Sequence, residues 1–470
     1  MLTRLEVDGF KNLLELEVDF GPFTCIAGEN GTGKSNLFDA IQFLSLLSSR
    51  SLIEAALEVR GATGERSGDP RELFWNGFGN HERRMSFAAE MIVPETVEDD
   101  FGREAEATST YLRYELRLGF QPPSGADRIG RMTLLHESLR HINLGDAPHR
   151  LRFPHNKSNF RDEVLKNKRS GQAFISTSGR DGQTTISIHQ DGGSRGQPKP
   201  AAASRAPATV VSTVTSSDDP TILAARREMQ SWQRLALEPT ALRAPDRYTD
   251  PQRMTANGLH LPATLFRIAQ QEPHGDPDRV YARVSGRLSD LAGVSVDELR
   301  VVEDEVRELL TVELREANGL RMPARGLSEG TLRFLSLCVL LEDPSVRGVL
   351  CMEEPENGIH PGNLEAMVEL VRDLAVDPTD VPGPDNPFRQ VLVNTHSPGV
   401  IRLVSPEDLL FADSVSVRSP EGRTTRALRL RPMADTWRGR SDRKSSVTRA
   451  DILVYLTTPP ADPKLTLENL

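Results

Sequence analysis

The sequence predicts an α/β fold with a mixed central sheet, an antiparallel side lobe and a helical insertion. Three observations lead to this prediction. Near the N-terminus a strand pattern is followed by a glycine-rich turn and then by a helix pattern. In the last third of the chain, apolar strands alternate with helices, which is typical of a parallel sheet. Between these regions lies a long segment in which most periodic stretches are helical.

Composition places the chain among ordinary globular proteins. Hydrophobic residues make up 37% and charged residues 26% of the 470 residues. No apolar run approaches the roughly 20 residues of a membrane-spanning helix, and the N-terminus has no export-signal pattern, so we expect a cytoplasmic protein without membrane contact. The three cysteines show neither disulfide nor metal-binding spacing. A net charge of −10 argues against unspecific coating of nucleic acid but leaves a local basic groove open.

The N-terminal region is expected to supply strands, one long helix and the side lobe. Alternating apolar and polar residues predict the strands, which cover residues 2–7, 14–20, 23–27, 85–92 and 111–119. Apolar residues at helical spacing predict a helix at 33–47, directly after the glycine-rich turn. The last two strands are assigned to the antiparallel lobe beside the central sheet.

The middle of the chain changes in composition. Residues 172–220 are rich in Gly, Ser, Thr, Ala and Pro, so the second half of this stretch is predicted to be a surface loop. Helical periodicity then resumes ahead of a strand at 310–314. The predicted helices are 222–236, 261–270 and 278–292. Sustained heptads are absent, which excludes a long coiled-coil arm.

From Gly326 onward, helices and apolar strands alternate. The predicted helices are 332–341 and 364–374, and the predicted strands are 348–352 and 390–394. Open parallel sheets bind ligands beyond the carboxyl ends of their strands. The glycine-rich turn, a pair of glutamates and a histidine all follow such strands, so we expect them to meet.

The glycine-rich turn has the pattern of a phosphate-binding loop. Residues 28–35 read GENGTGKS, which fits G-x-x-x-x-G-K-[ST] between a strand and a helix, and this context counts against an ordinary glycine turn. Glycines let the backbone curl so that amide groups point at phosphate oxygens. Lys34 would bridge the β- and γ-phosphates of ATP, and Ser35 would bind Mg²⁺. The expected ATP-binding residues are Gly28, Asn30, Gly31, Thr32, Gly33, Lys34, Ser35 and Asn36.

Two adjacent glutamates end the apolar strand at 348–352. Glu353 is assigned to Mg²⁺ and Glu354 to polarising the attacking water. Many P-loop proteins have aspartate at the first position, so Glu353 adds one methylene group and leaves its distance to the metal open. A solvated acidic loop is the alternative, because apolar strands ending in acids are common.

A second phosphate-binding edge is expected at the start of the helix that follows residue 328. Ser328, Gly330 and Thr331 lie where that helix begins. A serine at such a position most often caps the helix, and this is the alternative. With the helix N-terminus, these residues would instead hold the γ-phosphate of a nucleotide bound to another subunit, so the site would be complete only in a dimer.

His396 follows the last apolar strand of the predicted sheet. Its imidazole is expected to donate a hydrogen bond to the γ-phosphate and to respond to the loss of that phosphate after hydrolysis. A lone histidine is usually structural. The presence of the other three motifs favours a role in catalysis.

Together these segments resemble the ABC-like predicted ATPases of the AAA family, which are relatives of RecF, SMC and OLD-type heads. The matching stretches are FKN at 10–12, GENGTGKSN at 28–36, LSEGTLR at 327–333, EEPENGIHP at 353–361 and THSP at 395–398. The resemblance is good over residues 1–120 and 325–411 and thin elsewhere. It implies an ATPase head built from residues 1–150 and 326–470, with residues 151–325 as an insertion and a basic tail at the end.

The resemblance also implies that ATP lies between two heads, each offering its phosphate loop to one nucleotide and its signature loop at Ser328 to the other. We therefore expect an ATP-dependent homodimer. OLD-type relatives carry a nuclease domain with clustered acids after the head; the residues after His396 show no such cluster, so no intrinsic nuclease is expected. The glutamine switch loop of ABC heads has no clear place, because Gln42 fits a helix surface better.

Members of this family serve DNA repair, chromosome maintenance or defence against phage, often beside a partner protein. Arginines crowd residues 418–449, and phosphate backbones favour such surfaces, although a solvated strand and tail explain them equally well. Two functions stay open: ATP hydrolysis coupled to nucleic acid, and an ATP-gated module that assembles with a separate toxin, nuclease or other effector. The ATPase subunit of a membrane transporter fits less well, because the insertion would obstruct its interface.

Overall fold

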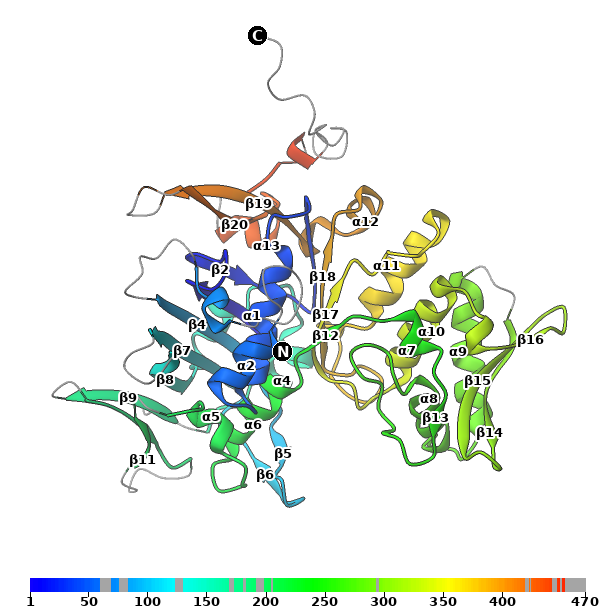
Figure 1. The fold of residues 1–470 in the computed structure, drawn as a ribbon, viewed down its shortest axis with the longest axis horizontal. Helices are drawn as coiled ribbons and strands as arrows, with labels where there is room; N and C mark the ends of the chain where they lie inside the picture. The colour runs from blue at the N-terminus through cyan, green and yellow to red at the C-terminus, as the bar shows by residue number, and fades with distance from the viewer. Residues whose placement is uncertain are drawn as a thin grey trace, which may run out of the picture.

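Three larger β-sheets and the helices packed on them make up the fold (Figure 1). The computed structural model describes residues 1–59, 69–75, 83–122, 130–168, 173–180, 183–191, 198–203, 206–292, 296–418, 422, 424–441, 446–448 and 450–452. Within these residues, no helix combines the length and the apolar character that crossing a membrane requires.

The central sheet has the strand order β12-β17-β18-β3-β19-β20. Its members are β12 (Gln233–Leu235), β17 (Gly348–Glu353), β18 (Arg389–Thr395), β3 (Phe23–Gly28), β19 (Leu409–Arg418) and β20 (Thr424–Pro432). The first five strands run parallel, and β20 pairs antiparallel with β19. The predicted mixed sheet is thereby confirmed. Strand β3, from the N-terminal region, lies between two strands of the C-terminal region.

Helices cover both faces of the central sheet (Figure 1). One face packs on α1 (Lys34–Leu47), and the opposite face packs on α10 (Glu329–Glu342) and α11 (Leu364–Asp373). Successive side chains of a strand point to opposite faces, so Cys351 joins the first apolar cluster and Met352 the second. Burial on both faces explains why these strands are almost continuously apolar.

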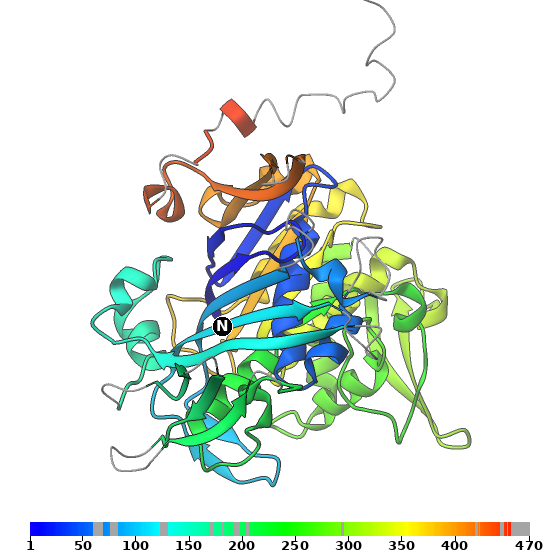
Figure 2. The same ribbon diagram turned by 60° about the vertical axis from the view of Figure 1, so that its left-hand side comes forward.

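The side lobe is an antiparallel sheet with the strand order β11-β10-β9-β8-β7-β4-β1-β2 (Figure 2). Its members are β1 (Leu2–Asp8), β2 (Leu16–Asp19), β4 (Arg83–Ile92), β7 (Tyr111–Gln121), β8 (Arg131–His141), β9 (Ile175–Arg180), β10 (Gln183–Ile188) and β11 (Lys199–Ala203). One face packs on α1, α2 (Leu52–Glu58) and α6 (Pro220–Gln230) in a shared apolar cluster. This lobe confirms the predicted antiparallel sheet beside the central one.

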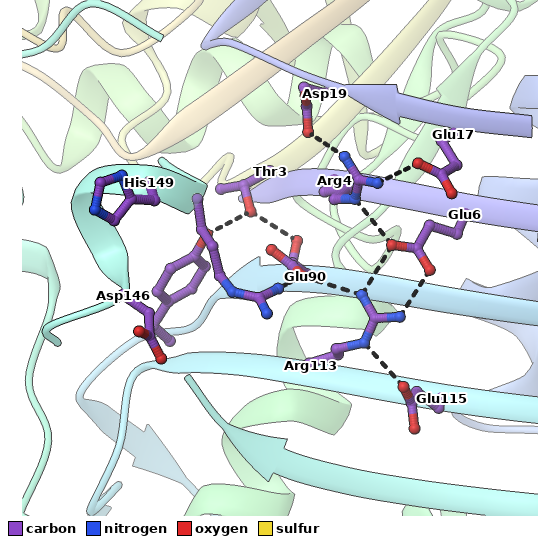
Figure 3. A network of polar contacts seen from close by, with 12 residues as sticks. Thr3, Arg4, Glu6, Glu17, Asp19, Glu90, Arg113, Glu115, Asp146 and His149 are labelled. Atoms are coloured by element: carbon purple, nitrogen blue, oxygen red, sulfur yellow. Dashed lines mark hydrogen bonds and ion pairs between the residues drawn. The ribbon is translucent and has the colours of Figure 1, made fainter. Parts of the chain in front are cut away.

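The other face of the side lobe carries a network of ion pairs (Figure 3). Arg113 of β7 contacts Glu6 at 2.7 Å, Glu90 at 3.0 Å and Glu115 at 2.9 Å. Alternation along each strand places these charged side chains on the face opposite the apolar cluster. Charged pairs on neighbouring strands stabilise a sheet by cross-strand attraction.

Residues 239–323 of the predicted insertion form a third sheet with helices on it. They contain α7 (Pro239–Leu242), β13 (Asp246–Arg247), α8 (Leu261–Gln270), α9 (Pro277–Ala292), β14 (Val296–Asp304), β15 (Leu309–Glu316) and β16 (Arg321–Pro323). Helices α8 and α9 pack on α10 and so attach the insertion to the central sheet.

The remaining elements are η1 (Pro70–Leu73), β5 (Thr96–Glu98), β6 (Glu104–Glu106), α3 (Ala147–Arg150), η2 (Lys157–Arg161), α4 (Asp162–Val164), α5 (Val210–Thr213), η3 (Ala324–Gly326), η4 (Pro361–Asn363), α12 (Pro398–Leu403), η5 (Pro406–Asp408) and α13 (Trp437–Ser441).

Two local predictions in the middle of the chain were wrong. The predicted surface loop contains strand β11, which pairs with β10 at the edge of the side lobe, where strands without large side chains and with proline are tolerated. The helix predicted at 222–236 ends at Gln230, and residues 233–235 form β12. Backbone pairing of β12 with β17 outweighs the helical pattern there.

Candidate active site

The register of three neighbouring strands decides where the predicted site residues lie. At the end of β17, Glu353 pairs with Asn394 of β18, and Asn394 in turn pairs with Ile26 of β3. Strand β3 then continues into the phosphate loop, and β18 continues to His396. The phosphate loop, the two glutamates and the histidine therefore leave the sheet at the same edge, as expected for parallel strands.

The phosphate loop curls around the side chain of Lys34. The Lys34 Nζ atom is buried and donates hydrogen bonds to the carbonyl oxygens of Gly28 at 2.7 Å and Glu29 at 2.9 Å. Gly31 and Gly33 have φ angles of 80° and 103°, in the left-handed region that favours glycine. This backbone shape brings the loop to the N-terminus of α1, where positive partial charge accumulates.

Asn12 fixes this loop from the turn after β1. Its side-chain amide donates to the carbonyl oxygen of Thr32 at 3.0 Å and accepts a hydrogen bond from Asn36 at 2.8 Å. A Cβ atom at Gly33 would lie 2.1 Å from Asn12 Nδ2, so no other residue fits there without moving Asn12. The FKN stretch at 10–12 thus has a structural role that the sequence resemblance did not specify.

The loop has the donors that a polyphosphate requires. The first amide groups of an α-helix have no partner within the helix, and Gly33 provides no side-chain cap for α1. Within the described residues, no protein acceptor takes a hydrogen bond from the amides of Gly31, Gly33, Lys34 or Ser35. Burial lowers the pKa of Lys34, and the nearby carboxylates of Glu354, Glu353 and Glu356 oppose this shift. The donor set therefore fits ATP, and the carboxylates beside it fit a divalent cation.

Glu354 occupies a strained turn beside His396. Its φ angle of 46° is left-handed, and its amide donates to the Asn394 carbonyl oxygen at 3.0 Å. One carboxylate oxygen lies 2.7 Å from His396 Nδ1, and the other accepts from Asn357 Nδ2 at 2.8 Å. Backbone strain of this kind persists where surrounding contacts enforce it, and it is concentrated at functional sites. From this turn the Glu354 carboxylate acts electrostatically on Lys34 and raises its pKa, opposing the effect of burial.

Glu356 is a further carboxylate near this edge. It is buried and accepts a hydrogen bond from the Thr395 hydroxyl group, while its Oε2 atom has no hydrogen-bond partner. Burial raises the pKa of Glu356 above its ordinary value. The sequence prediction did not assign this residue a role, although EEPE at 353–356 contained it.

Residues 23–402 match the family described as an AAA domain, putative AbiEii toxin, Type IV TA system. The chain belongs to this family of AAA domains. The predicted relation to ABC-like AAA ATPase heads is confirmed.

Curated relatives of this AAA domain match only short segments. A DNA replication and repair protein RecF from Parabacteroides distasonis is 48% identical over 50 residues, 10% of this chain and 14% of the relative. RecF from Cyanothece sp. is 35% identical over 100 residues, 19% of this chain and 26% of the relative. The chain thus covers at most about a quarter of these relatives.

Several solved Smc head structures also match this AAA domain over most of its length. One is the SmcHead bound to the C-winged helix domain of ScpA, which is 14% identical with a TM-score of 0.45, covering 92% of this chain and 98% of that chain. Another, from Thermotoga maritima, is 13% identical with a TM-score of 0.34 and the same two coverages. The likeness is too weak to support any further inference.

The predicted signature residues bond to one another at the start of α10. Ser328 caps α10 by accepting a hydrogen bond from the Thr331 amide at 3.1 Å. A Cβ atom at Gly330 would lie 3.1 Å from the carbonyl oxygen of Gly358, so the start of α10 packs on the loop that follows the two glutamates. Across the described part of the chain, no hydrogen bond or ion pair joins Ser328, Gly330 or Thr331 to residues 28–36. The capping role is therefore present, and the role toward another subunit stays a prediction.

Much of the predicted basic surface is already engaged within the protein. Arg429 pairs with Asp413 at 2.6 Å, and Arg438 is buried, where its guanidinium donates to the Thr24 hydroxyl at 2.7 Å. A buried guanidinium cannot reach a phosphate backbone, so Arg438 was wrongly counted as a candidate contact. Four basic residues of the stretch 418–449 lie outside the described residues, namely Arg423, Arg443, Lys444 and Arg449.

One charged residue of the site had no signal in the sequence. Arg234 of β12 pairs with Glu353 at 3.0 Å and with Asp39 of α1 at 3.3 Å. Asp39 is fully buried and also pairs with Lys11 at 2.8 Å. Arg234 was predicted to lie in a helix, and only the pairing of β12 with β17 brings it to the acidic residues.

Proposed function

We propose that this protein hydrolyses ATP to ADP and phosphate in a Mg²⁺-dependent reaction, at a site that two copies complete. The observation that carries the proposal is that the strand register brings Lys34 and the carboxylates of Glu353 and Glu354 to one sheet edge. Two distant segments, 28–35 and 353–354, supply a phosphate cradle, a buried cation and two acids, which is the set of groups that phosphoryl transfer to water requires.

Each residue has a distinct task in this proposal. The amides of residues 31–35 and the Lys34 ammonium hold the phosphates and neutralise their charge. Glu354 orients the attacking water and accepts its proton, and His396 Nδ1 holds the Glu354 carboxylate in place. The hydroxyl group of Ser35 and the carboxylate of Glu353 would hold Mg²⁺. When bound, that ion supplies charge neutralisation at the transferring phosphoryl group.

The signature residues extend the proposal to a dimer. Ser328 and Gly330 lie at the N-terminus of α10, where positive partial charge favours a phosphate group. In this proposal they act on a nucleotide held by a second copy. Two equivalent sites related by a two-fold axis follow from such an arrangement.

A mixing experiment tests this composite site. In a Lys34→Ala homodimer both phosphate loops lack their lysine. In a Ser328→Arg homodimer a bulky charge blocks both signature helices. Neither variant alone should therefore hydrolyse ATP. A mixture contains heterodimers with one intact site, and we expect it to regain about a quarter of the wild-type rate, because half of the dimers then carry one of two sites. The measurement is steady-state phosphate release.

The exposed Ser158→Arg serves as the control for this experiment and should leave the rate unchanged. A mixture that stays inactive, or a Ser328→Arg variant that hydrolyses ATP normally, contradicts the composite site. Thermal unfolding of each variant shows whether a lost rate has its origin in folding.

A second function is favoured by the family description, which names a toxin–antitoxin system. In this alternative, ATP occupancy licenses assembly with a separate toxin or nuclease effector, and hydrolysis is slow without the partner. The RecF relatives, whose name refers to DNA replication and repair, favour coupling to DNA instead. The ATPase rate with and without duplex and single-stranded DNA distinguishes them: stimulation supports DNA coupling, and an unchanged rate supports a protein partner.

A further inference from the structure

Arg234 connects two acidic residues that belong to different parts of the site. Its guanidinium contacts Glu353 on β17 and Asp39 on α1, and its side chain is only 17% exposed. In the parallel pairing, Arg234 lies opposite Cys351, so it shares a sheet face with Glu353 two residues further on. That face packs on α1, the helix that begins at the phosphate loop.

Asp39 does not need Arg234 to remain paired. Lys11 lies 2.8 Å from Asp39, and its side chain is 6% exposed. A second cation for Asp39 alone would therefore be redundant, since burying charge without need is costly. The contact with Glu353 therefore explains the presence of an arginine on β12.

Glu353 has a particular need for such a partner. A glutamate has one more rotatable bond than an aspartate, so its carboxylate occupies more positions at a strand end. The 3.0 Å contact from Arg234 Nη2 to Glu353 Oε2 fixes one of the two carboxylate oxygens. Residues that bind a metal are commonly held in this way by an outer hydrogen-bonding partner, whose removal weakens metal affinity roughly 10- to 100-fold.

We propose that Arg234 is a positioning residue that holds Glu353 in the orientation required for Mg²⁺, and that this contact lets a glutamate serve at this position. The inference rests on the proposed function, because it assigns Glu353 to the metal. Arg234 itself acts through Glu353 and Asp39 and contacts neither nucleotide nor metal. Its contribution should therefore appear in the Mg²⁺ dependence of nucleotide binding.

The test is equilibrium binding of a fluorescent ATP analogue to the full chain at increasing Mg²⁺ concentrations. For Arg234→Met we expect the half-saturating Mg²⁺ concentration to rise roughly tenfold, the lower end of the effect of losing an outer partner. Affinity for the analogue in EDTA should stay unchanged. In a Glu353→Gln background, Arg234→Met should cause no further shift, because the residue through which it acts has already lost its charge.

Arg113→Met is the matched control. Arg113 is 18% exposed and also pairs with several glutamates, but on the outer face of the side lobe (Figure 3). The Arg113→Met variant should keep the wild-type half-saturating Mg²⁺ concentration. The inference is overturned if both variants shift the half-saturating Mg²⁺ concentration equally, or if Arg234→Met does not shift it. The proposed function stands in either case. If the wild-type protein binds the analogue equally well with and without Mg²⁺, the proposed metal role itself is wrong.

Discussion

Replacing Lys34 by alanine should reduce ATP affinity by up to about 100-fold, because a charge-assisted contact to phosphate contributes up to about 3 kcal/mol and each 1.4 kcal/mol is a factor of ten. The Lys34 ammonium is buried inside the phosphate loop, where it donates to the carbonyl oxygens of Gly28 and Glu29. No other described lysine lies within this loop. Isothermal titration calorimetry with ATP and Mg²⁺ measures the loss directly.

Lys168→Ala provides the control for this variant, since its side chain is 55% exposed and pairs with two surface glutamates. It should bind ATP as the wild-type protein does. Retained affinity in a folded Lys34→Ala variant would place the nucleotide elsewhere and remove the basis of the proposed function.

The second large effect is expected from Glu354→Gln. Glutamine keeps the size of the side chain but cannot accept a proton, so turnover should fall by roughly 100- to 10,000-fold, the range for losing a general base. ATP binding should persist, because the phosphate loop is untouched. With hydrolysis blocked, the ATP-bound dimer should accumulate, and size-exclusion chromatography with light scattering in ATP and Mg²⁺ measures it.

Glu369→Gln is a suitable comparison, because Glu369 lies exposed on α11. It should hydrolyse ATP at the wild-type rate and remain in the wild-type monomer–dimer balance. Normal turnover by Glu354→Gln would assign the general base to another group, and the buried Glu356 is another carboxylate in the same turn.

The sequence predicted those parts of the site that depend on neighbouring residues. The phosphate loop is a contiguous pattern, and the strand before it and the helix after it are set by local periodicity. The apolar strands β17 and β18 were equally clear, because burial on both faces leaves a continuous apolar run. The rule that ligands bind at the carboxyl ends of parallel strands then placed Glu354 and His396 at one edge.

The contacts that hold the site together depend on long-range pairing and could not be predicted. Arg234 lies 195 residues from Asp39, on a three-residue strand whose surroundings have a helical pattern. The role of Asn12 depends on how closely the turn after β1 approaches Gly33, which no spacing reveals. The strands of the insertion were partly missed for the same reason, because β11 is defined by its partner β10 and not by its composition.

The position of β3 between β18 and β19 also constrains how the protein is made. During synthesis the phosphate loop is translated long before β18 and β19, the strands on both of its sides. Because long-range strand pairing must close a large loop first, this part of the molecule forms late and slowly. Until then β3 has both edges unpaired, and unpaired strand edges promote aggregation.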